Sequence, residues 1–293
     1  MLKNSSLFCK NCYRKFPIKY NIPILLPKSM NSDVKLSMGK WDTDYKKKID
    51  KKRMRALKQS YEDTYYYSEL SYLRKTVESF ENIIYLEIGS GTFFLGQKLA
   101  RMGAFVVGID FSVNALHLAK FYLAEEKIKN YLLVCGDITK MPFKDNVFDL
   151  LYGGGVIEHF KDTVGIVKEN HRVLKKGGIA FNTVPYLNLG SLTYRQVWGN
   201  IPNIPILRQA AEFVHIKLLK GRRMIYGYEY SFTKEKLRKI FLKSGFTNNN
   251  IEIDKFKVPL LFEYITINLL KKIATFMANS NLFWPVLYIK SKK

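Results

Sequence analysis

Two glycines and an acid lie where a predicted strand ends, in an order typical of a nucleotide-binding turn. Residues 83–88 (IIYLEI) form an apolar run of the kind that builds a buried strand, and the run carries one acid, Glu87. The turn 89–91 (Gly-Ser-Gly) follows, and then apolar residues recur at helical spacing over residues 94–100. A strand, a glycine turn and a helix form the first half of a nucleotide-binding βαβ unit, because bare backbone lets a ligand approach closely.

A second acid, Asp110, ends the next predicted strand, residues 104–110 (AFVVGID). It lies about twenty residues beyond the glycine turn, which is the spacing of a carboxylate that binds the hydroxyls of a ribose. NAD and S-adenosylmethionine both contain that ribose, so the spacing does not distinguish them. Phe93 and Phe94 occupy the positions where a dinucleotide fold needs a third small residue, and this disfavours a pyrophosphate ligand.

Two more predicted strands end in residues that suit a binding site. The strand at 131–137 (YLLVCGD) ends in Asp137, and a short turn follows it. The strand at 147–155 (VFDLLYGGG) ends in three glycines, and Glu158 and His159 come directly after them. The carboxyl ends of parallel strands meet at one edge of a sheet, so we expect these residues to share a site with the glycine turn.

A helix that ends within residues 170–178 (NHRVLKKGG) and a fifth strand at 179–186 (IAFNTVPY) complete the series. In this order, LEIGSG, GID, GDITKMPF, FDLLYGGGVIEH and RVLKKGG resemble the motifs of class I S-adenosylmethionine-dependent methyltransferases of the type 11 group. The resemblance covers roughly Tyr65 to Phe256. It implies an α/β fold: a Rossmann-like, seven-stranded, mostly parallel sheet with an antiparallel last strand, helices on both faces, and an inserted lid after strand five.

The resemblance also implies S-adenosylmethionine as the cofactor, bound at the matching motif positions. In the family pattern the glycine turn holds the amino-acid and ribose parts, Asp110 binds both ribose hydroxyls, and Asp137 binds the adenine amine. Glu87 helps to position the methionine ammonium. The implied cofactor-binding residues are Glu87, Gly89, Ser90, Gly91, Asp110, Phe111, Asp137, Ile138, Gly153 and Gly154. The sequence departs from the pattern at Phe93, where a small residue is usual and where a phenyl ring would narrow the pocket.

Methyl transfer needs an aligned acceptor, and an oxygen or nitrogen acceptor also needs a group that removes its proton. His159 is the first candidate for this base and Glu158 the second, because both follow the strand-four glycines at the expected mouth of the pocket. His159 could equally hydrogen-bond the fold at a helix start or contact the cofactor, so both roles stay open. His215 is a weaker candidate, and His171 is expected to be structural.

The chain of 293 residues carries a formal net charge of +23 and is 47% hydrophobic, enough for a sizeable core. The charge permits binding to nucleic acid, an anionic membrane or acidic sugars, but the lysines are spread along the whole chain, which favours a solvated surface. No apolar run reaches the length of a spanning helix, and the N-terminus lacks the apolar core of a secretory signal. Three cysteines give no disulfide framework, so we predict a cytoplasmic protein.

Residues 1–30 are similar to the second half of a Trm112-type zinc ribbon. Cys9 and Cys12 form a C-x-x-C pair at zinc-ligand spacing, and FPI and IPILLP follow. The first C-x-x-C of such a ribbon is absent and no histidine lies nearby, so we expect a degenerate ribbon without a metal. A metal shared between chains, or completed by a segment upstream, is the alternative.

The rest of the chain divides into a basic linker and one methyltransferase domain. Residues 31–60 are lysine-rich and are expected to form a solvated linker or surface helix, with a phosphate-contacting arm as the alternative. The domain covers residues 61–293. Its first helix is expected over 61–80, with Tyr65, Tyr66 or Tyr67 over the cofactor.

Two later segments of that domain are individual to this chain. Residues 186–230, rich in aromatic and basic residues, are predicted to form an acceptor-side lid, with a helical hairpin packed by Leu207, Ala210, Ala211 and Val214 as the simpler interpretation. The amphipathic stretch 263–278 is expected to cover the sheet, with a membrane surface as the alternative.

Two classes of function follow. The first is an enzyme that transfers a methyl group to an oxygen or nitrogen of a small-molecule, glycan or lipid-linked acceptor. An RNA methyltransferase is the alternative among enzymes, although no RNA-binding module is recognisable, so nucleic acid is possible but not favoured as a partner. The second class is a non-catalytic S-adenosylmethionine-binding module. The oligomeric state is left open by the sequence.

Overall fold

The structure is a computed structural model that describes residues 6–28, 32–50, 66–193, 195–196, 199–222, 224, 227–256 and 268–293; for residues 32–38, 40, 66, 67 and 278 it describes the backbone alone. The strands are β1 (Ser6–Phe8), β2 (Lys15–Lys19), β3 (Ile22–Pro23), β4 (Ile84–Ile88), β5 (Phe105–Asp110), β6 (Tyr131–Cys135), β7 (Phe148–Gly154), β8 (Leu174–Pro185), β9 (Ile201–Pro202), β10 (Tyr230–Ser231), β11 (Ile251–Lys255) and β12 (Val286–Lys292).

The helices are α1 (Ser32–Lys47), α3 (Tyr66–Arg74), α4 (Phe94–Arg101), α5 (Val113–Glu125), α6 (Thr163–Val173), α7 (Leu189–Leu192), α8 (Pro205–Glu212), α9 (Lys234–Lys243) and α10 (Asn268–Asn279). Shorter turns are the 3₁₀ helices η1 (Ile138–Lys140), η2 (Ile157–His159) and η5 (Asn248–Asn250), and the π-helix η4 (Phe213–Leu218).

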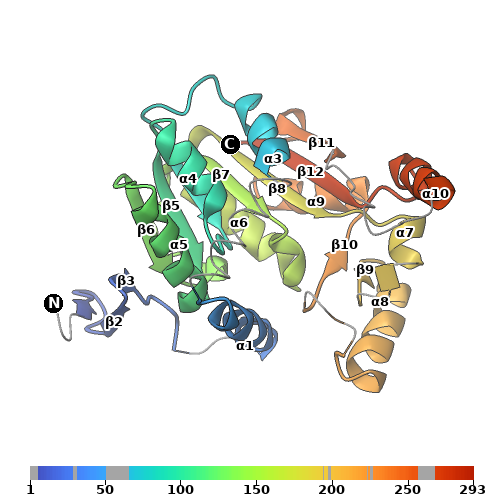
Figure 1. Cartoon of the computed structure of the whole chain (residues 1–293), viewed down its shortest axis with the longest axis horizontal. Helices are drawn as coiled ribbons and strands as arrows, with labels where there is room; N and C mark the ends of the chain where they lie inside the picture. The colour runs from blue at the N-terminus through green and yellow to red at the C-terminus, as the bar shows by residue number, and fades with distance from the viewer. Residues whose placement is uncertain are drawn as a thin grey trace. The chain divides into compact units, whose positions relative to one another are not determined.

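Seven strands form one sheet in the order β11-β12-β8-β7-β4-β5-β6 (Figure 1). β4 pairs in parallel with β5 and β7, β5 pairs in parallel with β6, and β11 pairs antiparallel with β12. This sheet confirms the predicted fold class, the Rossmann-like sheet of class I methyltransferases. By its contacts the chain divides into two compact units, each described by itself below.

The first unit comprises Met1–Gly153, Lys168–Phe181 and Lys292–Lys293. Its helices α4 and α5 cover one face of β4, β5 and β6 (Figure 1). Their caps use residue types that helix ends favour. Ser112 accepts a hydrogen bond from the Ala115 amide at the start of α5, and Gly103 adopts a positive φ directly after α4. These caps fix where each helix starts or stops beside the strand tips.

Phe93 begins α4 in the left-handed region, with a φ of 57°, and its ring is fully buried. A Cβ at Gly96 would lie 2.4 Å from this ring, and a Cβ at Gly108 would lie 3.1 Å from it. Two glycines, one on α4 and one on β5, therefore provide the space that the ring fills. Because the ring lies in the core between these elements, its packing gives no support to the expectation that it narrows the cofactor pocket.

This packing predicts that Gly96→Ala destabilises the protein by about 1–3 kcal/mol, because the new methyl group overlaps the Phe93 ring. Urea unfolding measures the change. Gly39→Ala is the matched control, since nothing lies within 4 Å of a Cβ at that helical position and alanine favours the helix. The double variant Phe93→Ala/Gly96→Ala should cost less than the sum of the two single changes. Strict additivity would show that the two sites do not touch.

Two predicted helices end at Arg74 and Val173 in the structure. The helix expected over residues 61–80 ends at Arg74, so Val77 does not extend its apolar stripe; the Thr76 hydroxyl bonds the Tyr72 carbonyl, which competes with the helical backbone. The helix expected to end within residues 170–178 ends at Val173, and β8 begins at once, before the strand start expected at residue 179. A Cβ at Gly178 would lie 2.9 Å from the Phe148 carbonyl oxygen, so this stretch needs glycine to run close beside β7.

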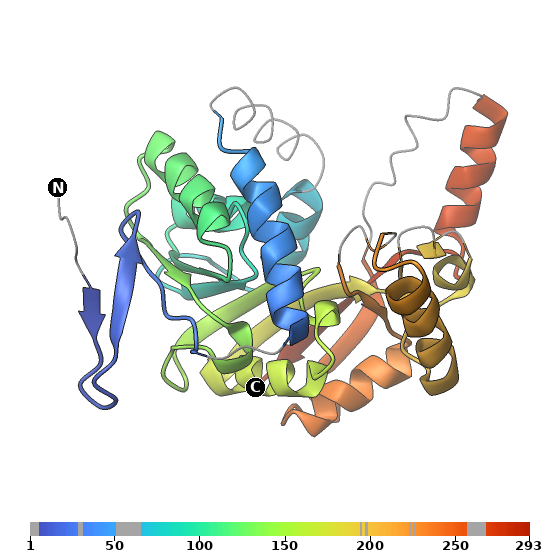
Figure 2. The same cartoon turned by 90° about the horizontal axis from the view of Figure 1, so that it is seen from below.

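The N-terminal segment forms an antiparallel ribbon, β1-β2-β3, beside the outer edge of β6 (Figure 2). The Leu25 amide donates to the Cys135 carbonyl at 2.7 Å, and Ile24 forms a parallel bridge with Cys135. The ribbon thus continues the sheet at its edge. Cys9 and Cys12 lie at the β1–β2 turn, while Cys135 is buried in β6. Whether the cysteine pair binds a metal, and the Trm112 resemblance itself, stay predictions.

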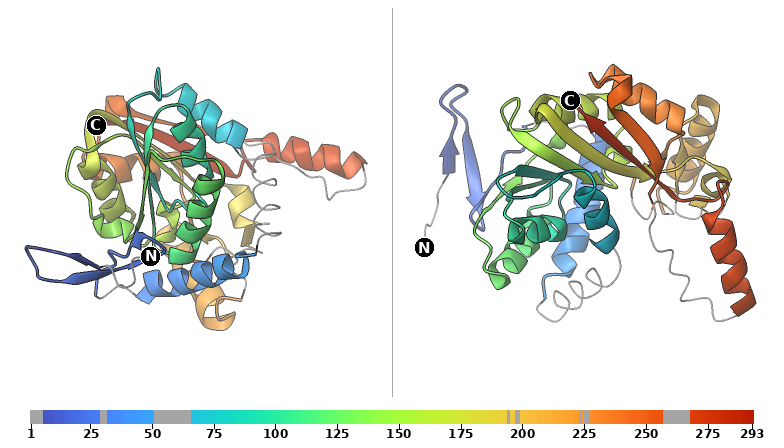
Figure 3. Two further views of the ribbon diagram at one scale, coloured as in Figure 1. Left: turned by 60° about the vertical axis from the view of Figure 1, so that its left-hand side comes forward. Right: turned by 90° about the horizontal axis from the view of Figure 1, so that it is seen from above.

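Helix α1 occupies the segment that was expected to be a linker or a surface helix. It packs against α5, and Figures 2 and 3 show the two helices side by side. Asp42 of α1 accepts hydrogen bonds from the Ser112 hydroxyl at 2.6 Å and from the Asn114 side-chain amide at 2.9 Å. The described part of this segment is therefore docked on the first unit through a carboxylate at the N-terminus of α5, where the helix dipole favours an anion.

The second unit comprises Gly154–Val167 and Asn182–Ser291. Thr233 caps α9 by accepting from the Lys236 amide. The lid segment, residues 186–230, contains α7, β9, α8 and η4, and β9 pairs in parallel with β10. The alternative of a packed hairpin was wrong for its described residues. Leu207, Ala210 and Val214 are exposed and Ala211 is half-buried, so α8 buries no apolar face.

Candidate active site

The predicted cofactor residues of the first unit lie at the carboxyl tips of three neighbouring parallel strands. The register places Ile88 of β4 beside Ile109 of β5, and Asp110 beside Cys135 of β6. The Ser90 amide donates to the Ile109 carbonyl at 3.1 Å, and the Gly136 amide donates to the Asp110 carbonyl at 2.9 Å. The turns that follow β4, β5 and β6 are therefore joined at one edge of the sheet.

Asp110 connects the glycine turn to the start of α5. Its Oδ2 accepts from the Gly91 amide and its Oδ1 from the Ser112 amide, both at 2.8 Å. Gly89 and Gly91 adopt φ values of 57° and 51°, which favour glycine. Burial raises the pKa of Asp110 to about 6 against the lowering effect of these amide donors, and Asp42 raises it further.

Glu87 lies buried behind the glycine turn. Its Oε2 accepts from the Tyr85 hydroxyl and from the Gly96 amide, both at 3.0 Å, whereas its Oε1 has no hydrogen bond from the described residues. Burial raises the pKa of Glu87 to about 8, and the nearby carboxyl of Glu69 adds to the rise. A carboxyl in this state favours a ligand that brings a positive charge.

Glu69 was missed in the sequence analysis. It lies on α3, where it accepts a hydrogen bond from the hydroxyl of Tyr152 near the end of β7. Burial raises the pKa of Glu69 to about 7, with the Tyr152 bond acting in the opposite direction. The sequence signal for Glu69 was an acid directly before Leu70, on the amphipathic segment that precedes the first strand of the large sheet. Only the fold brings that acid close to Glu87.

The buried Glu87 and the half-buried Glu69 thus form an acidic pair to which no described residue supplies a cation. Neither forms an ion pair with a lysine, arginine or histidine in the part of the chain that the structure describes. Buried charges in proteins are normally paired, so both carboxyls ionise readily only when a cationic group comes close. The sulfonium and ammonium groups of S-adenosylmethionine are such groups, and the pair therefore fits this ligand.

The remaining predicted cofactor residues of this unit follow β5, β6 and β7. Asp137 Oδ1 caps η1 by accepting from the Thr139 amide and hydroxyl at 2.8 Å, while its Oδ2 has no partner among the described residues. Phe111 is half-buried, and its carbonyl accepts from the Cys135 thiol at 3.4 Å. The side chain of Ile138 and the backbone of Gly153 are buried. Asp137 therefore keeps one free carboxylate oxygen for a ligand.

Helix α1 approaches the same corner of the first unit. A Cβ at Gly91 would lie 2.7 Å from the Tyr45 hydroxyl, so a side chain at this glycine would meet α1. From the sequence, Tyr65, Tyr66 or Tyr67 is expected to lie over the cofactor. Tyr65 and the side chains of the other two lie outside what the structure describes. Of the described tyrosines, it is Tyr45 whose hydroxyl lies against the glycine turn.

Glu158, His159 and Gly154 lie in the second unit. His159 is half-buried, and its Nδ1 lies 2.6 Å from the Tyr228 carbonyl oxygen. A carbonyl can only accept, so Nδ1 carries the proton and Nε2 of the neutral ring keeps a lone pair. Burial and the proximity of Glu229 raise the pKa of Glu158 well above its usual value. Burial therefore favours the protonated form of Glu158, whereas the hydrogen bond at Nδ1 leaves Nε2 of His159 as the atom that can accept a proton.

The lid segment contributes a buried ion pair near Glu158. Arg195 donates to Glu229 at 3.4 Å, and the Asn200 amide donates to the same carboxylate at 2.8 Å. The weaker candidate His215 is buried and its Nε2 lies 3.0 Å from Gln196 Oε1. Other residues proposed for the lid, Tyr194, Trp198, Arg223 and Tyr226, lie outside the described residues.

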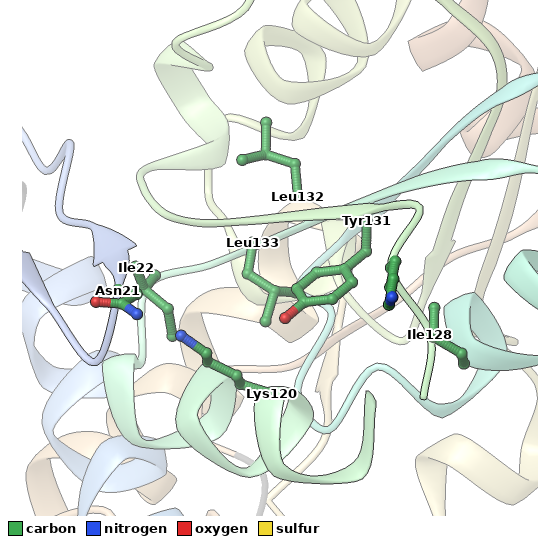
Figure 4. A pocket seen from close by; sticks show the side chains of 8 residues that line it. Asn21, Ile22, Lys120, Ile128, Tyr131, Leu132 and Leu133 are labelled. Atoms are coloured by element: carbon green, nitrogen blue, oxygen red, sulfur yellow. The ribbon is translucent and has the colours of Figure 1, made fainter. Parts of the chain in front are cut away.

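A cavity of about 440 Å³ lies away from these residues, in the first unit (Figure 4). It is lined by Asn21, Ile22, Lys120, Ile128, Lys129, Tyr131, Leu132 and Leu133. These residues come from the N-terminal ribbon, α5 and β6, and none of the predicted site residues is among them. We therefore assign the candidate site from the strand tips and their hydrogen bonds.

Residues 86–182 match a methyltransferase domain family of type 11. The ubiquinone biosynthesis O-methyltransferase of Pelagibacter ubique is 34% identical over 110 residues, which cover 37% of this chain and 45% of that protein. The demethylmenaquinone methyltransferase of Lactococcus lactis is 32% identical over 162 residues, which cover 54% of this chain and 62% of that protein. The chain thus spans about half the length of these curated relatives.

Two solved structures resemble the fold. The phosphoethanolamine N-methyltransferase 2 of Haemonchus contortus in complex with S-adenosyl-L-methionine has a TM-score of 0.58 at 19% identity, over 92% of this chain and 61% of that chain. A chain from the Haloferax volcanii complex of the Trm112 activator with a putative methyltransferase has a TM-score of 0.57 at 14% identity, over 87% of this chain and 97% of that chain.

The seven-stranded sheet and the match over residues 86–182 support a class I S-adenosylmethionine-dependent methyltransferase, a class whose methyl donor is S-adenosylmethionine. The match to the type 11 methyltransferase domain ends at Asn182, before residues 186–230. That the glycine turn, Asp110 and Asp137 bind the cofactor stays a prediction.

The raised pKa of Glu87 predicts a pH-dependent stability. The folded protein binds this proton more tightly than the unfolded chain, so the stabilisation is complete below about pH 4.3 and is lost as the pH rises through about 8. The free energy of unfolding of the wild type should therefore fall relative to Glu87→Gln over that window, by a few kcal/mol. Urea unfolding at about pH 5.5, 7 and 8.5 measures it. The exposed variant Glu78→Gln is the control, and parallel curves for wild type and Glu87→Gln would contradict the assignment.

Proposed function

We propose that this protein is an S-adenosylmethionine-dependent methyltransferase that methylates an oxygen or nitrogen of a small-molecule acceptor. The observation that carries the proposal is the joining of the glycine turn, Asp110 and the Asp137 turn at the tips of three adjacent parallel strands. The acidic pair Glu69–Glu87 supports it, because no described cation pairs with these carboxyls and a cationic cofactor would complement them.

S-adenosylmethionine supplies an activated methyl group on a sulfonium, and the chain's residues bind and orient it. We infer that Asp110 and Asp137 accept from hydroxyl and amine groups of the nucleoside, as their family positions imply. The glycine turn offers backbone groups without side chains, and Gly153 and Gly154 leave space. His159 removes the acceptor's proton through Nε2, because its Nδ1–H is oriented by the Tyr228 carbonyl.

The names of the two relatives support a small-molecule acceptor, since both are named for quinone-related compounds. Glycan and lipid-linked acceptors remain within the proposal, because the lid segment is rich in aromatic and basic residues. RNA is the less favoured acceptor, since the net charge of +23 is spread along the chain. The cytoplasmic location is likewise a prediction.

Calorimetry with S-adenosylmethionine and S-adenosylhomocysteine tests the cofactor assignment. Asp110→Asn should weaken binding of both by about tenfold to a hundredfold, because a hydrogen-bonded carboxylate is lost. The exposed variant Asp254→Ala is the control and should bind as the wild type does. Thermal unfolding shows whether Asp110→Asn is folded. If the folded wild type binds neither S-adenosylmethionine nor S-adenosylhomocysteine, the proposed function is wrong.

The acceptor base is tested by comparing two neighbouring variants in a methyl-transfer screen against quinols, glycans, lipid-linked sugars and RNA. His159→Ala should lower turnover by about a hundredfold at nearly unchanged cofactor affinity, because proton removal contributes about that much. Glu158→Gln should have a much smaller effect, since glutamine resembles the protonated carboxyl that burial already favours. Equal losses in the two variants would contradict the assignment of His159. Methylation of RNA alone would favour the alternative function.

A further inference from the structure

Helix α10, in the second unit, has two opposite faces. Its apolar residues recur at positions i, i+1, i+4, i+7 and i+8, which form one continuous stripe on a helix. They are Leu269, Leu270, Ile273, Phe276 and Met277. Lys271, Lys272 and Thr275 lie on the other side, and the helix contains no acidic residue. Such a sequence folds as a helix when its apolar stripe is covered.

That stripe is uncovered in the structure. Phe276 is 79% exposed and Leu269 is 67% exposed, and the other three residues of the stripe are also exposed. Ala274 is the half-buried residue of the helix, and it lies beside the stripe. Figure 3 shows α10 at the periphery of its unit, and the exposure of its apolar side chains shows that no described element covers them. This corrects the expectation that the helix covers the sheet.

An uncovered apolar stripe is costly for a helix of this length. Isolated helices of about 12–15 residues are marginal in water, and most of their stability in proteins comes from burying one face. Contiguous exposed apolar residues on a folded protein usually mark a surface that binds something. Helix α10 therefore needs a partner that takes an apolar face from one side.

The charge of the surroundings indicates the chemistry of that partner. Lys271 and Lys272 lie on the polar side of α10, the helix contains no acid, and the chain carries a formal net charge of +23. A second apolar set in the same unit, Ile206, Phe213 and Leu218, is also exposed. The exposed cations Lys217, Lys220 and Arg222 belong to the same segment. Apolar residues beside cations, without acids, suit an apolar phase with an anionic surface.

We propose that the apolar face of α10 binds the surface of an anionic lipid bilayer. The helix lies in the interface, with Phe276 and Leu269 among the acyl chains and the lysines at the phosphate level. Among the described residues no helix is long and apolar enough to cross a bilayer, so the attachment is peripheral. The proposal goes beyond methyl transfer and does not depend on it. It would bring the second unit to a surface where lipid-linked or quinone-like acceptors are concentrated.

Flotation of the full chain with vesicles tests this surface. The wild type should float with vesicles of phosphatidylglycerol and phosphatidylcholine, and binding should fall steeply with added salt. The double variant Leu269→Ser/Phe276→Ser should bind about tenfold or more weakly, because it removes the two most exposed apolar side chains of α10. Leu242→Ser is the matched control, since Leu242 is an exposed leucine on α9 of the same unit.

A second pair of variants tests the lysines. Lys271→Glu/Lys272→Glu should lower affinity for the anionic vesicles by more than about tenfold, since each lysine near such a surface contributes about a fivefold effect. Lys236→Glu/Lys239→Glu makes the same change in net charge on exposed positions of α9 and should have a smaller effect. If both pairs of variants lose vesicle affinity equally, binding depends on the overall charge of the chain, and the proposed role of α10 is wrong.

Two other results would overturn the proposal. One is a wild-type chain that does not float with anionic vesicles. The other is a wild-type dimer that Leu269→Ser/Phe276→Ser converts to a monomer in sedimentation velocity without any change in vesicle binding. That result would make the stripe an interface between two copies. Thermal unfolding of each variant, compared with the wild type, confirms that the fold is intact in these comparisons.

Discussion

The carboxylate of Asp110 is the interaction on which the candidate site depends. It binds the Gly91 amide with one oxygen and the Ser112 amide with the other, and so ties the turn after β4 to the start of α5. Asp42 binds the same helix start from α1. The buried carboxylate of Asp110 and the half-buried carboxylate of Asp42 thus position two loops and an N-terminal helix. Hydrogen bonds to carboxylates are among the stronger ones in proteins.

The same carboxylates are kept in an unfavourable state without a ligand. Burial raises the pKa of Asp110, Glu69 and Glu87, and no described cation pairs with the last two. A protein tolerates such a cluster when function requires it, since replacing it by apolar groups would be less costly. Under the proposed function, a cationic nucleoside cofactor would supply a positive charge to this cluster.

The second unit leaves part of its apolar surface exposed to solvent. Its lid segment buries an ion pair, Arg195–Glu229, yet α8 and α10 leave apolar side chains in solvent. The residues that would carry acceptor recognition therefore belong to a part of the protein whose apolar surface is incompletely covered. The type 11 family match stops at Asn182, before this part begins. The match thus covers the strand-tip residues that are expected to bind the cofactor and does not extend to residues 186–230.

The sequence alone determined the succession of strands along the chain and the glycine turn, because these depend on local patterns of apolar residues and glycine. The caps at Ser112 and Thr233 are equally local, because each depends on a hydroxyl side chain next to its helix. The sequence also placed Asp110 and Asp137 at strand ends. It did not find Glu69, Asp42 or Tyr45. Each of these acts on a residue distant in the chain, and nothing in its own neighbourhood shows which element it will face.

Burial, too, was decided by tertiary structure. The sequence predicted a large residue in a tight turn at Phe93, but only the packing shows that Gly96 and Gly108 make room for its ring. It predicted an amphipathic stretch at 263–278 that covers the sheet, whereas the exposure of α10 shows that its apolar face does not pack against the sheet. Periodicity reports that a helix has an apolar side; which surface that side meets depends on the arrangement of all the other elements.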